Sequence, residues 1–148
     1  MGNTEVLEAV QRRAVKAVSN LRSQNYEDRL QELGMDTLVE RRKRGDLVTA
    51  YKVHSGKDNI DPATWFKTFE PAGGAVTRRQ AGYQNMETPQ WRGEARKNFW
   101  SVRVCEPWNS LPDKVKKLET VNGFKNSVDN IKGWGGHKQG QVAAQSEH

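Results

Sequence analysis

Residues 36–54 read DTLVERRKRGDLVTAYKVH and form the longest helical pattern in the chain. Asp36 is a residue type that caps helices, because its carboxylate accepts hydrogen bonds from amides without a helical partner. Gly56 lies just beyond the pattern and can adopt the left-handed dihedrals of a helix end. The stretch therefore predicts a helix over about 37–54. Its second half is apolar enough to pack, through Leu47, Val48, Ala50, Tyr51 and Val53.

The first half of this helix carries a dense run of positive charge. Glu40 is followed by four cationic residues, hereafter the basic run: Arg41, Arg42, Lys43 and Arg44. Like charges at this density repel one another unless counter-charges lie nearby, which favours an anionic partner. The alternative is a solvated helix face, with the positive charges balanced by the carboxylates of Glu40 and Asp46.

Further helices are predicted on the N-terminal side and just after this stretch. Asn25 opens a second, short helix that Gly34 ends, and Asp61-Pro62 is a helix-start signal. The first helix begins near Thr4 and carries apolar residues at helical spacing: Leu7, Val10, Ala14, Ala17, Val18 and Leu21.

The C-terminal third also has a helical pattern. Pro112 starts a short helix, and Thr120 caps a last helix with an apolar face of Val121, Phe124, Val128 and Ile131. Large rings in apolar surroundings are predicted to form the core: Phe66, Trp100, Trp108 and Phe124. Trp91 and Trp134 lie among glycine and polar residues and are the candidates for exposed rings.

Residues 69–94 and 133–148 differ from the rest. Glycine and proline punctuate 69–94 without a sustained period, so we predict a long loop there, with a short basic extended piece at Arg78 and Arg79. Residues 133–148 are rich in glycine and glutamine and predict a flexible tail. The expected fold is all-α, a small multi-helix bundle. One helical domain covers 1–132 (helices over 4–68, loop over 69–94, helices over 95–132), and the tail follows.

Composition favours an anionic partner. The net charge is +6, the isoelectric point is near 9.6 and the mean hydropathy is −0.91; a protein that merely happens to be basic remains the alternative. The single cysteine, Cys105, excludes an internal disulfide and is predicted to be a packed thiol. Without a long apolar stretch or a signal-peptide core, we expect an intracellular chain, cytoplasmic or nuclear, with no membrane partner.

Three motifs in order carry a family resemblance: RRKRGDLVTAYK at 41–52, DPATWF at 61–66 and WNSLP at 108–112. Together they resemble the thumb end and post-thumb segment of reverse transcriptases from non-LTR (LINE-type) retrotransposons of the jockey and chicken-repeat kind. The resemblance covers about 4–132 and is weakest over 69–94. The polymerases of that family hold two magnesium ions on paired palm aspartates, and this sequence has no Asp-Asp pair. We therefore expect an excised or domesticated fragment without enzymatic activity or a cofactor.

What the resemblance implies is a grip on RNA or an RNA–DNA duplex through its phosphate backbones. Basic side chains supply such contacts, and an exposed ring adds base stacking. The candidate residues are Arg12, Arg13, Lys16, Arg41, Arg42, Lys43, Arg44, Arg78, Arg79, Trp91, Arg96, Lys97 and Arg103.

Two other functions stay open at this point. The thin core and exposed tryptophans are also typical of a protein-interaction or structural module. A small-ligand or metal-binding role that uses the aromatic segment is the third possibility, although Asp58, Asn59 and Asp61 lack the spacing of a calcium loop. The three histidines do not have metal-ligand spacing either, so we name no metal ligand.

Overall fold

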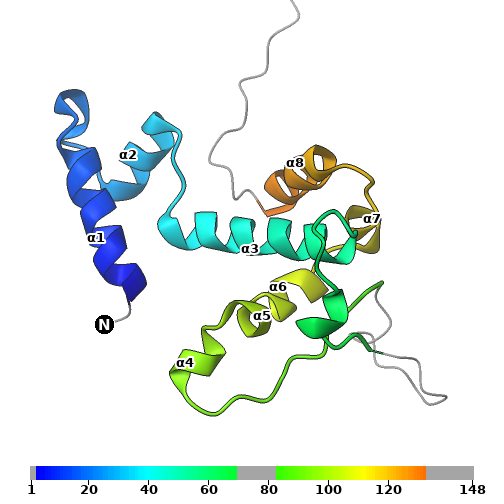
Figure 1. Ribbon diagram of the computed structural model, residues 1–148. Helices are drawn as coiled ribbons and strands as arrows, with labels where there is room; N and C mark the ends of the chain where they lie inside the picture. The colour runs from blue at the N-terminus through cyan, green and yellow to red at the C-terminus, as the bar shows by residue number, and fades with distance from the viewer. Residues whose placement is uncertain (1–2, 70–82, 133–148) are drawn as a thin grey trace, which may run out of the picture. The chain divides into compact units, whose positions relative to one another are not determined.

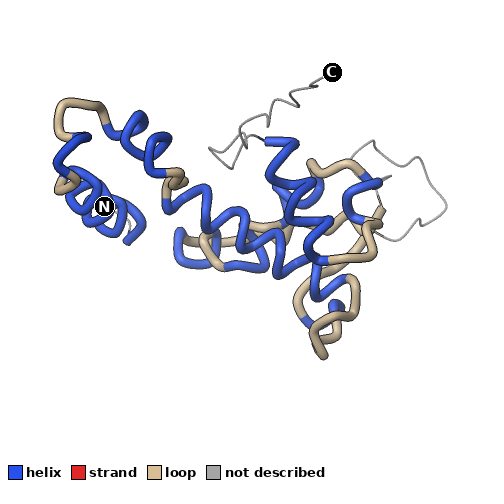
Figure 2. Tube along the Cα trace, turned by 90° about the horizontal axis from the view of Figure 1, so that it is seen from above, coloured by secondary structure: helices blue, strands red, loops and turns tan. Residues whose placement is uncertain are grey.

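The computed structural model describes residues 3–69 and 83–132, and within them the chain is all-α, as predicted. Outside the helices, these residues form turns and loops (Figure 2). One isolated antiparallel bridge joins Thr68 and Met86 among them. The elements are α1 (Asn3–Lys16), η1 (Ser19–Leu21), α2 (Tyr26–Leu33), α3 (Leu38–His54), η2 (Pro62–Thr64), α4 (Glu94–Lys97), α5 (Trp100–Arg103), α6 (Cys105–Asn109), α7 (Asp113–Lys116) and α8 (Val121–Lys132), where η marks a 3-10 helix.

Contacts within the chain group it into two compact units, where the sequence analysis treated 1–132 as one helical domain. Unit 1 comprises Met1–Arg41 and Asp129–His148, and unit 2 comprises Arg42–Val128. Each unit has buried apolar residues of its own, so each is described by itself.

In unit 1, α1 and α2 are joined mainly by polar contacts. The Tyr26 hydroxyl donates to Glu8 and accepts from Gln11 Nε2 at 3.1 Å. Arg29 is buried and donates from Nε to the carbonyl of Leu21 at 2.8 Å, which ties α2 to η1. These bonds compensate for a small apolar core, in which the buried aliphatic side chains of the described part of this unit are Val15, Leu21 and Leu30.

The apolar stripe predicted on the first helix is mostly on the surface of unit 1. Leu7 and Val10 are 58% and 63% exposed, whereas the buried residue of α1 is Val15, which lies outside the predicted stripe. Leu21, the last residue of the stripe, is buried. Helical spacing therefore identified the element but not the face that packs.

Local capping explains where most helices start and stop. Asn25 accepts from the Asp28 amide at 2.8 Å, and Gly34 ends α2 at a φ of 66°, both as predicted. For α3 the predicted cap, Asp36, is wrong. Thr37 Oγ1 accepts from the Glu40 amide at 3.2 Å, and Glu40 accepts from the Thr37 amide at 3.1 Å, which is the reciprocal capping box.

In unit 2, α3 lies between α8 on one side and α5 and α6 on the other (Figure 1). The rings of Tyr51 and Phe124 stack with centroids 4.3 Å apart and join α3 to α8. Trp108 on α6 is fully buried, and its ring centroid is 6.1 Å from that of Phe124. The predicted core rings Trp108, Phe124 and Phe66 are buried, and Trp100 is partly so.

The described end of the predicted loop is anchored to unit 2. Asn109 donates to the carbonyl of Met86 and accepts from its amide, both at 2.8 Å, so one side chain binds the backbone as a β-strand neighbour would. Trp108 Nε1 adds a bond to the Gln84 carbonyl at 3.0 Å. Residues 83–93 are non-helical as predicted, and α4 begins at Glu94. The basic extended piece and the tail fall outside the described residues.

Candidate nucleic-acid interface

The basic run lies on the first half of α3. Arg41, Arg42 and Lys43 are exposed and Arg44 is half-buried. Arg42 and Arg44 have interaction partners in the folded chain, so Arg41 and Lys43 are the members considered for contact with an anion. Two positions apart on an α-helix, Arg41 and Lys43 project from different sides of α3, so they would contact different phosphates.

The two carboxylates nearest to the basic run along α3 are engaged elsewhere. Glu40 accepts hydrogen bonds from the Thr37 amide and hydroxyl in the capping box, at 3.1 and 2.8 Å. Asp46 forms a bidentate ion pair with Arg103 of α5. Asp46 is therefore neutralised by a residue outside the basic run, whereas Glu40 is oriented toward Thr37 by neutral donors and keeps its charge.

Arg103, a predicted phosphate-binding residue, is engaged in bonds within unit 2. Its Nε and Nη2 donate to the two carboxylate oxygens of Asp46 at 2.6 and 2.7 Å, and its Nη1 donates to the Asn98 carbonyl at 2.6 Å. These bonds join α5 to α3 and use three of the five N–H donors of the guanidinium, and the ion pair with Asp46 offsets the charge that Arg103 would present to a phosphate.

The three candidate cations of α1 belong to unit 1. The guanidinium of Arg12 lies 4.7 Å from the centroid of the Tyr26 ring, a cation–π contact that holds it on α2. Arg13 and Lys16 are exposed. Arg13 and Lys16 therefore form a small basic surface on α1.

A second basic surface combines charge with exposed rings, and the sequence analysis identified only part of it. The guanidinium of Arg96 lies 5.3 Å from the centroid of Phe99, and Phe99 stacks on Trp65 with centroids 6.2 Å apart. Trp65 and Phe99 are 40% and 43% exposed. Trp100 contacts Trp65 edge-on from behind, at 5.9 Å. We call Trp65 and Phe99, backed by Trp100, the aromatic platform.

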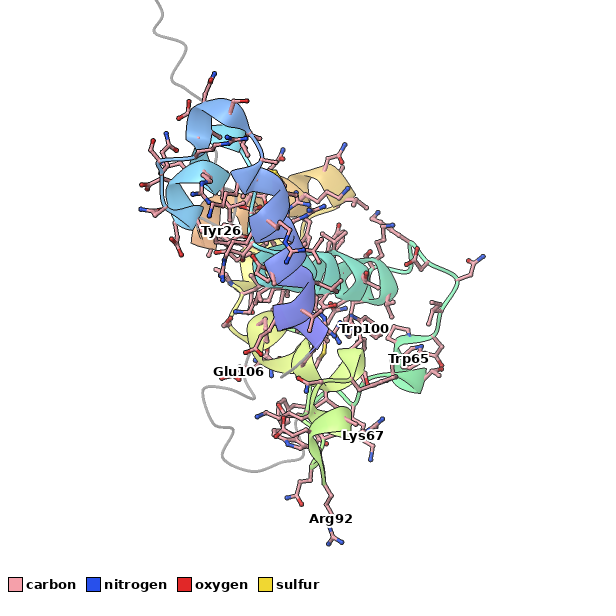
Figure 3. The ribbon with its side chains drawn as sticks, turned by 90° about the vertical axis from the view of Figure 1, so that its left-hand side faces the viewer. Tyr26, Trp65, Lys67, Arg92, Trp100 and Glu106 are labelled. Carbon is pink, nitrogen blue, oxygen red and sulfur yellow. The ribbon has the colours of Figure 1, made fainter. Side chains whose placement is uncertain are left out.

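Figure 3 shows how the labelled residues of this region lie. Trp65 and Trp100 lie together, and Lys67 projects from the segment that follows Trp65. Arg92 extends away from the fold. Trp91, the preceding residue, is 42% exposed, as predicted. Lys97 is exposed and only loosely paired with Glu94, at 3.9 Å. Arg78 and Arg79 lie outside the described residues.

Two titratable groups in the core of unit 2 are held in their neutral forms. The ring of His54 stacks between Phe66 and Trp108, at 5.2 and 5.1 Å, and burial with nearby Lys116 lowers its pKa to about 4. Burial raises the pKa of Cys105 to about 11, which confirms the predicted packed thiol. Neither group has the exposure or the pKa of a catalytic nucleophile or base at neutral pH.

Other kinds of site have less support. Within 3–69 and 83–132, three or more His, Cys, Asp or Glu side chains do not gather in a cluster that could hold a metal ion. A depression of about 410 Å³ in unit 1 is lined by Gln24, Asp28, Gln31 and Glu32, so its charge is negative and unsuited to an anion. The helices of these same residues include none long and apolar enough to cross a membrane.

Comparison of the chain with known protein families, with curated proteins and with solved structures finds no match.

Proposed function

We propose that this chain is a non-enzymatic nucleic-acid-binding protein that grips RNA or an RNA–DNA duplex through its phosphate backbone. The observation that carries the proposal is the exposed positive charge of Arg41 and Lys43 on α3, beside two carboxylates engaged elsewhere. Arg96 and Lys97 are exposed cations of unit 2 that could also contact phosphates. A net charge of +6 strengthens the long-range attraction of a polyanion.

The family resemblance points to the same partner. Motifs at 41–52, 61–66 and 108–112 resemble the end of a non-LTR retrotransposon reverse transcriptase, a region that lies against template and primer. The sequence contains no Asp-Asp pair for a two-metal centre, so we propose binding without polymerisation. A role with RNA places the chain in the cytoplasm or the nucleus.

The direct test is the salt dependence of binding to a short RNA hairpin. Affinity should fall steeply between about 50 and 200 mM salt, because cations released from the phosphates drive association. The double variant Arg41→Ala and Lys43→Ala should bind more weakly and lower the slope of log affinity against log salt by about 1.4 to 1.8, the value for two lost phosphate contacts.

A charge-matched variant separates this site from general attraction. Lys57→Ala with Lys114→Ala removes the same charge from exposed positions off the basic run. It should leave the affinity and the slope close to those of the unmodified protein. Equal losses in the two variants, or an affinity that ignores salt, would contradict the proposal.

One observation favours a second candidate function, a protein-interaction module. Val6, Leu7 and Val10 of α1 are 57%, 58% and 63% exposed, a cluster of aliphatic side chains that usually marks a binding surface. Light scattering across a concentration series would detect self-association. A mass that rises with concentration, and returns to the monomer value after Val10→Asp, would support this function; a constant monomer mass would weaken it.

A further inference from the structure

The aromatic platform is the exposed end of a series of ring contacts that starts in the core of unit 2. Each ring contacts the next with centroids between 4.3 and 6.2 Å apart, in the order Tyr51, Phe124, Trp108, His54, Phe66, Trp100, Trp65 and Phe99. The first rings are buried, while Trp65 and Phe99 are about two-fifths exposed. The platform therefore packs on Trp100, which in turn contacts the buried ring of Phe66.

Such anchoring matters because exposed aromatic side chains otherwise lose conformational entropy when they bind. Trp65 is held by contacts with Phe99 and Trp100, and Trp100 is held in turn by Phe66, which is 5% exposed. Rings that are already positioned in the free protein bind a flat ligand at a smaller entropic cost.

The charge around the platform is positive. The Arg96 guanidinium lies over Phe99, and exposed Lys97 and Lys67 flank the two rings in sequence. The carboxylates close in sequence to the two rings are Glu94, which is loosely paired with Lys97, and Asp61, which accepts from the Ala63 amide as the cap of η2. Flat exposed rings bordered by cations are complementary to a ligand that is both aromatic and anionic.

We propose that the aromatic platform binds unpaired nucleobases of a single-stranded nucleic acid. In a duplex, neighbouring base pairs cover the faces of each base, whereas an unpaired base can place its face on a tryptophan or phenylalanine ring. The adjacent cations then lie where the phosphates of the same strand pass. This assignment rests on the proposed function and specifies its ligand: the protein contacts a strand through its bases at the platform as well as through its backbone.

The test compares two fluorescent oligomers of equal length by anisotropy, oligo(dA) and an abasic oligodeoxynucleotide that keeps the phosphates but lacks the bases. The unmodified full chain should bind oligo(dA) at least about fivefold more tightly, as expected for one or more stacked bases. In the double variant Trp65→Leu and Phe99→Leu, the two affinities should become equal, while the affinity for the abasic oligomer stays unchanged.

Two controls keep structural damage apart from lost stacking. Trp65→Phe retains an aromatic face and should keep the preference for oligo(dA). Tyr83→Leu removes another ring that is 40% exposed and has a cation over it, Lys117 at 4.8 Å, but that does not belong to the platform. It should also keep the preference. If Tyr83→Leu abolished the preference as fully as the double variant, the assignment would be wrong.

The outcomes distinguish base stacking on the platform from the proposed binding of the phosphate backbone. Salt-dependent binding of both oligomers with equal affinity would overturn the stacking assignment. The proposed binding of phosphates would still hold, and the platform would then be tested as a surface for a protein partner. Failure to bind either oligomer or the RNA hairpin would overturn both. The variant Arg41→Ala and Lys43→Ala should weaken both oligomers alike and keep their ratio, since it removes charge without touching a ring.

Discussion

At the scale of single residues, His54 makes the stability of unit 2 depend on pH. Its ring lies between Phe66 and Trp108, and its pKa is lowered from 6.5 to about 4. Between these values the unfolded chain binds a proton that the folded chain excludes, so the free energy of unfolding decreases as pH falls. We expect a loss of about 3 kcal/mol between pH 7 and 4 from this residue.

Urea unfolding followed by tryptophan fluorescence at several pH values measures this loss. Carboxylates titrate in the same range, so the relevant quantity is the difference from the variant His54→Phe, which keeps an aromatic ring in the stack and removes the proton. The pH dependence of the variant should be shallower by the stated amount. Parallel curves for the two proteins would show that His54 is protonated without cost in the folded state.

The ion pair between Arg103 and Asp46 is a second residue-scale feature with a measurable energy. The side chains are 26% and 13% exposed, so water screens the pair only in part. In a double-mutant cycle with Arg103→Ala and Asp46→Ala, the losses of unfolding free energy should be less than additive, with a coupling of about 1 to 3 kcal/mol. Additive losses would mean that the two side chains do not stabilise each other, and the case for Arg103 as a phosphate-binding residue would be stronger.

At the scale of elements, the capping box sets the start of α3. Thr37→Ala removes the acceptor for the Glu40 amide and should lower the free energy of unfolding by about 1 kcal/mol. Thr37→Ser keeps the hydroxyl and should lose much less. Thermal unfolding followed by circular dichroism compares the two. Equal destabilisation would indicate that the methyl group, rather than the hydrogen bond, is what the position requires.

Capping also shows how far sequence reasoning reaches at this scale. Asn25, Gly34 and Asp61 act where the pattern placed them, because a cap depends on residues within one turn. Asp36 and Thr37 are both suitable caps in isolation. The feature that distinguishes them is the glutamate three residues after Thr37, which is the sequence pattern of a capping box. Element starts are therefore readable from sequence where every interacting partner is local.

The candidate site was less accessible to such reasoning, because its contacts are distant in sequence. Arg103 and Asp46 are 57 positions apart, and no local pattern predicts that they pair. Trp65 and Phe66 are adjacent, yet Phe66 is 5% exposed and Trp65 is 40% exposed. Which of two neighbouring rings faces solvent depends on the elements packed against them. Charge density identified the basic run, but only the fold shows which of its carboxylate neighbours are engaged.

At the scale of the whole molecule, the two units differ in how much apolar surface they bury. The buried aliphatic side chains described in unit 1 are Val15, Leu21 and Leu30, whereas unit 2 buries Trp108, Phe124 and a larger set of aliphatic residues around them. Burial of apolar area is the main favourable term in folding, so the local free energy of opening should be lower in unit 1.

Amide hydrogen exchange followed by mass spectrometry or NMR measures this difference directly. Amides of α1 and α2 should exchange through local opening, at rates that change little with low concentrations of urea. Amides in the second half of α3 and in α6 should exchange only through an opening that exposes much more surface, and should therefore respond strongly to urea. Addition of an RNA hairpin should slow exchange in unit 2 if the basic run and the aromatic platform hold the ligand. Protection confined to α1 would instead assign binding to Arg13 and Lys16, and the interface proposed on α3 and the aromatic platform would be wrong.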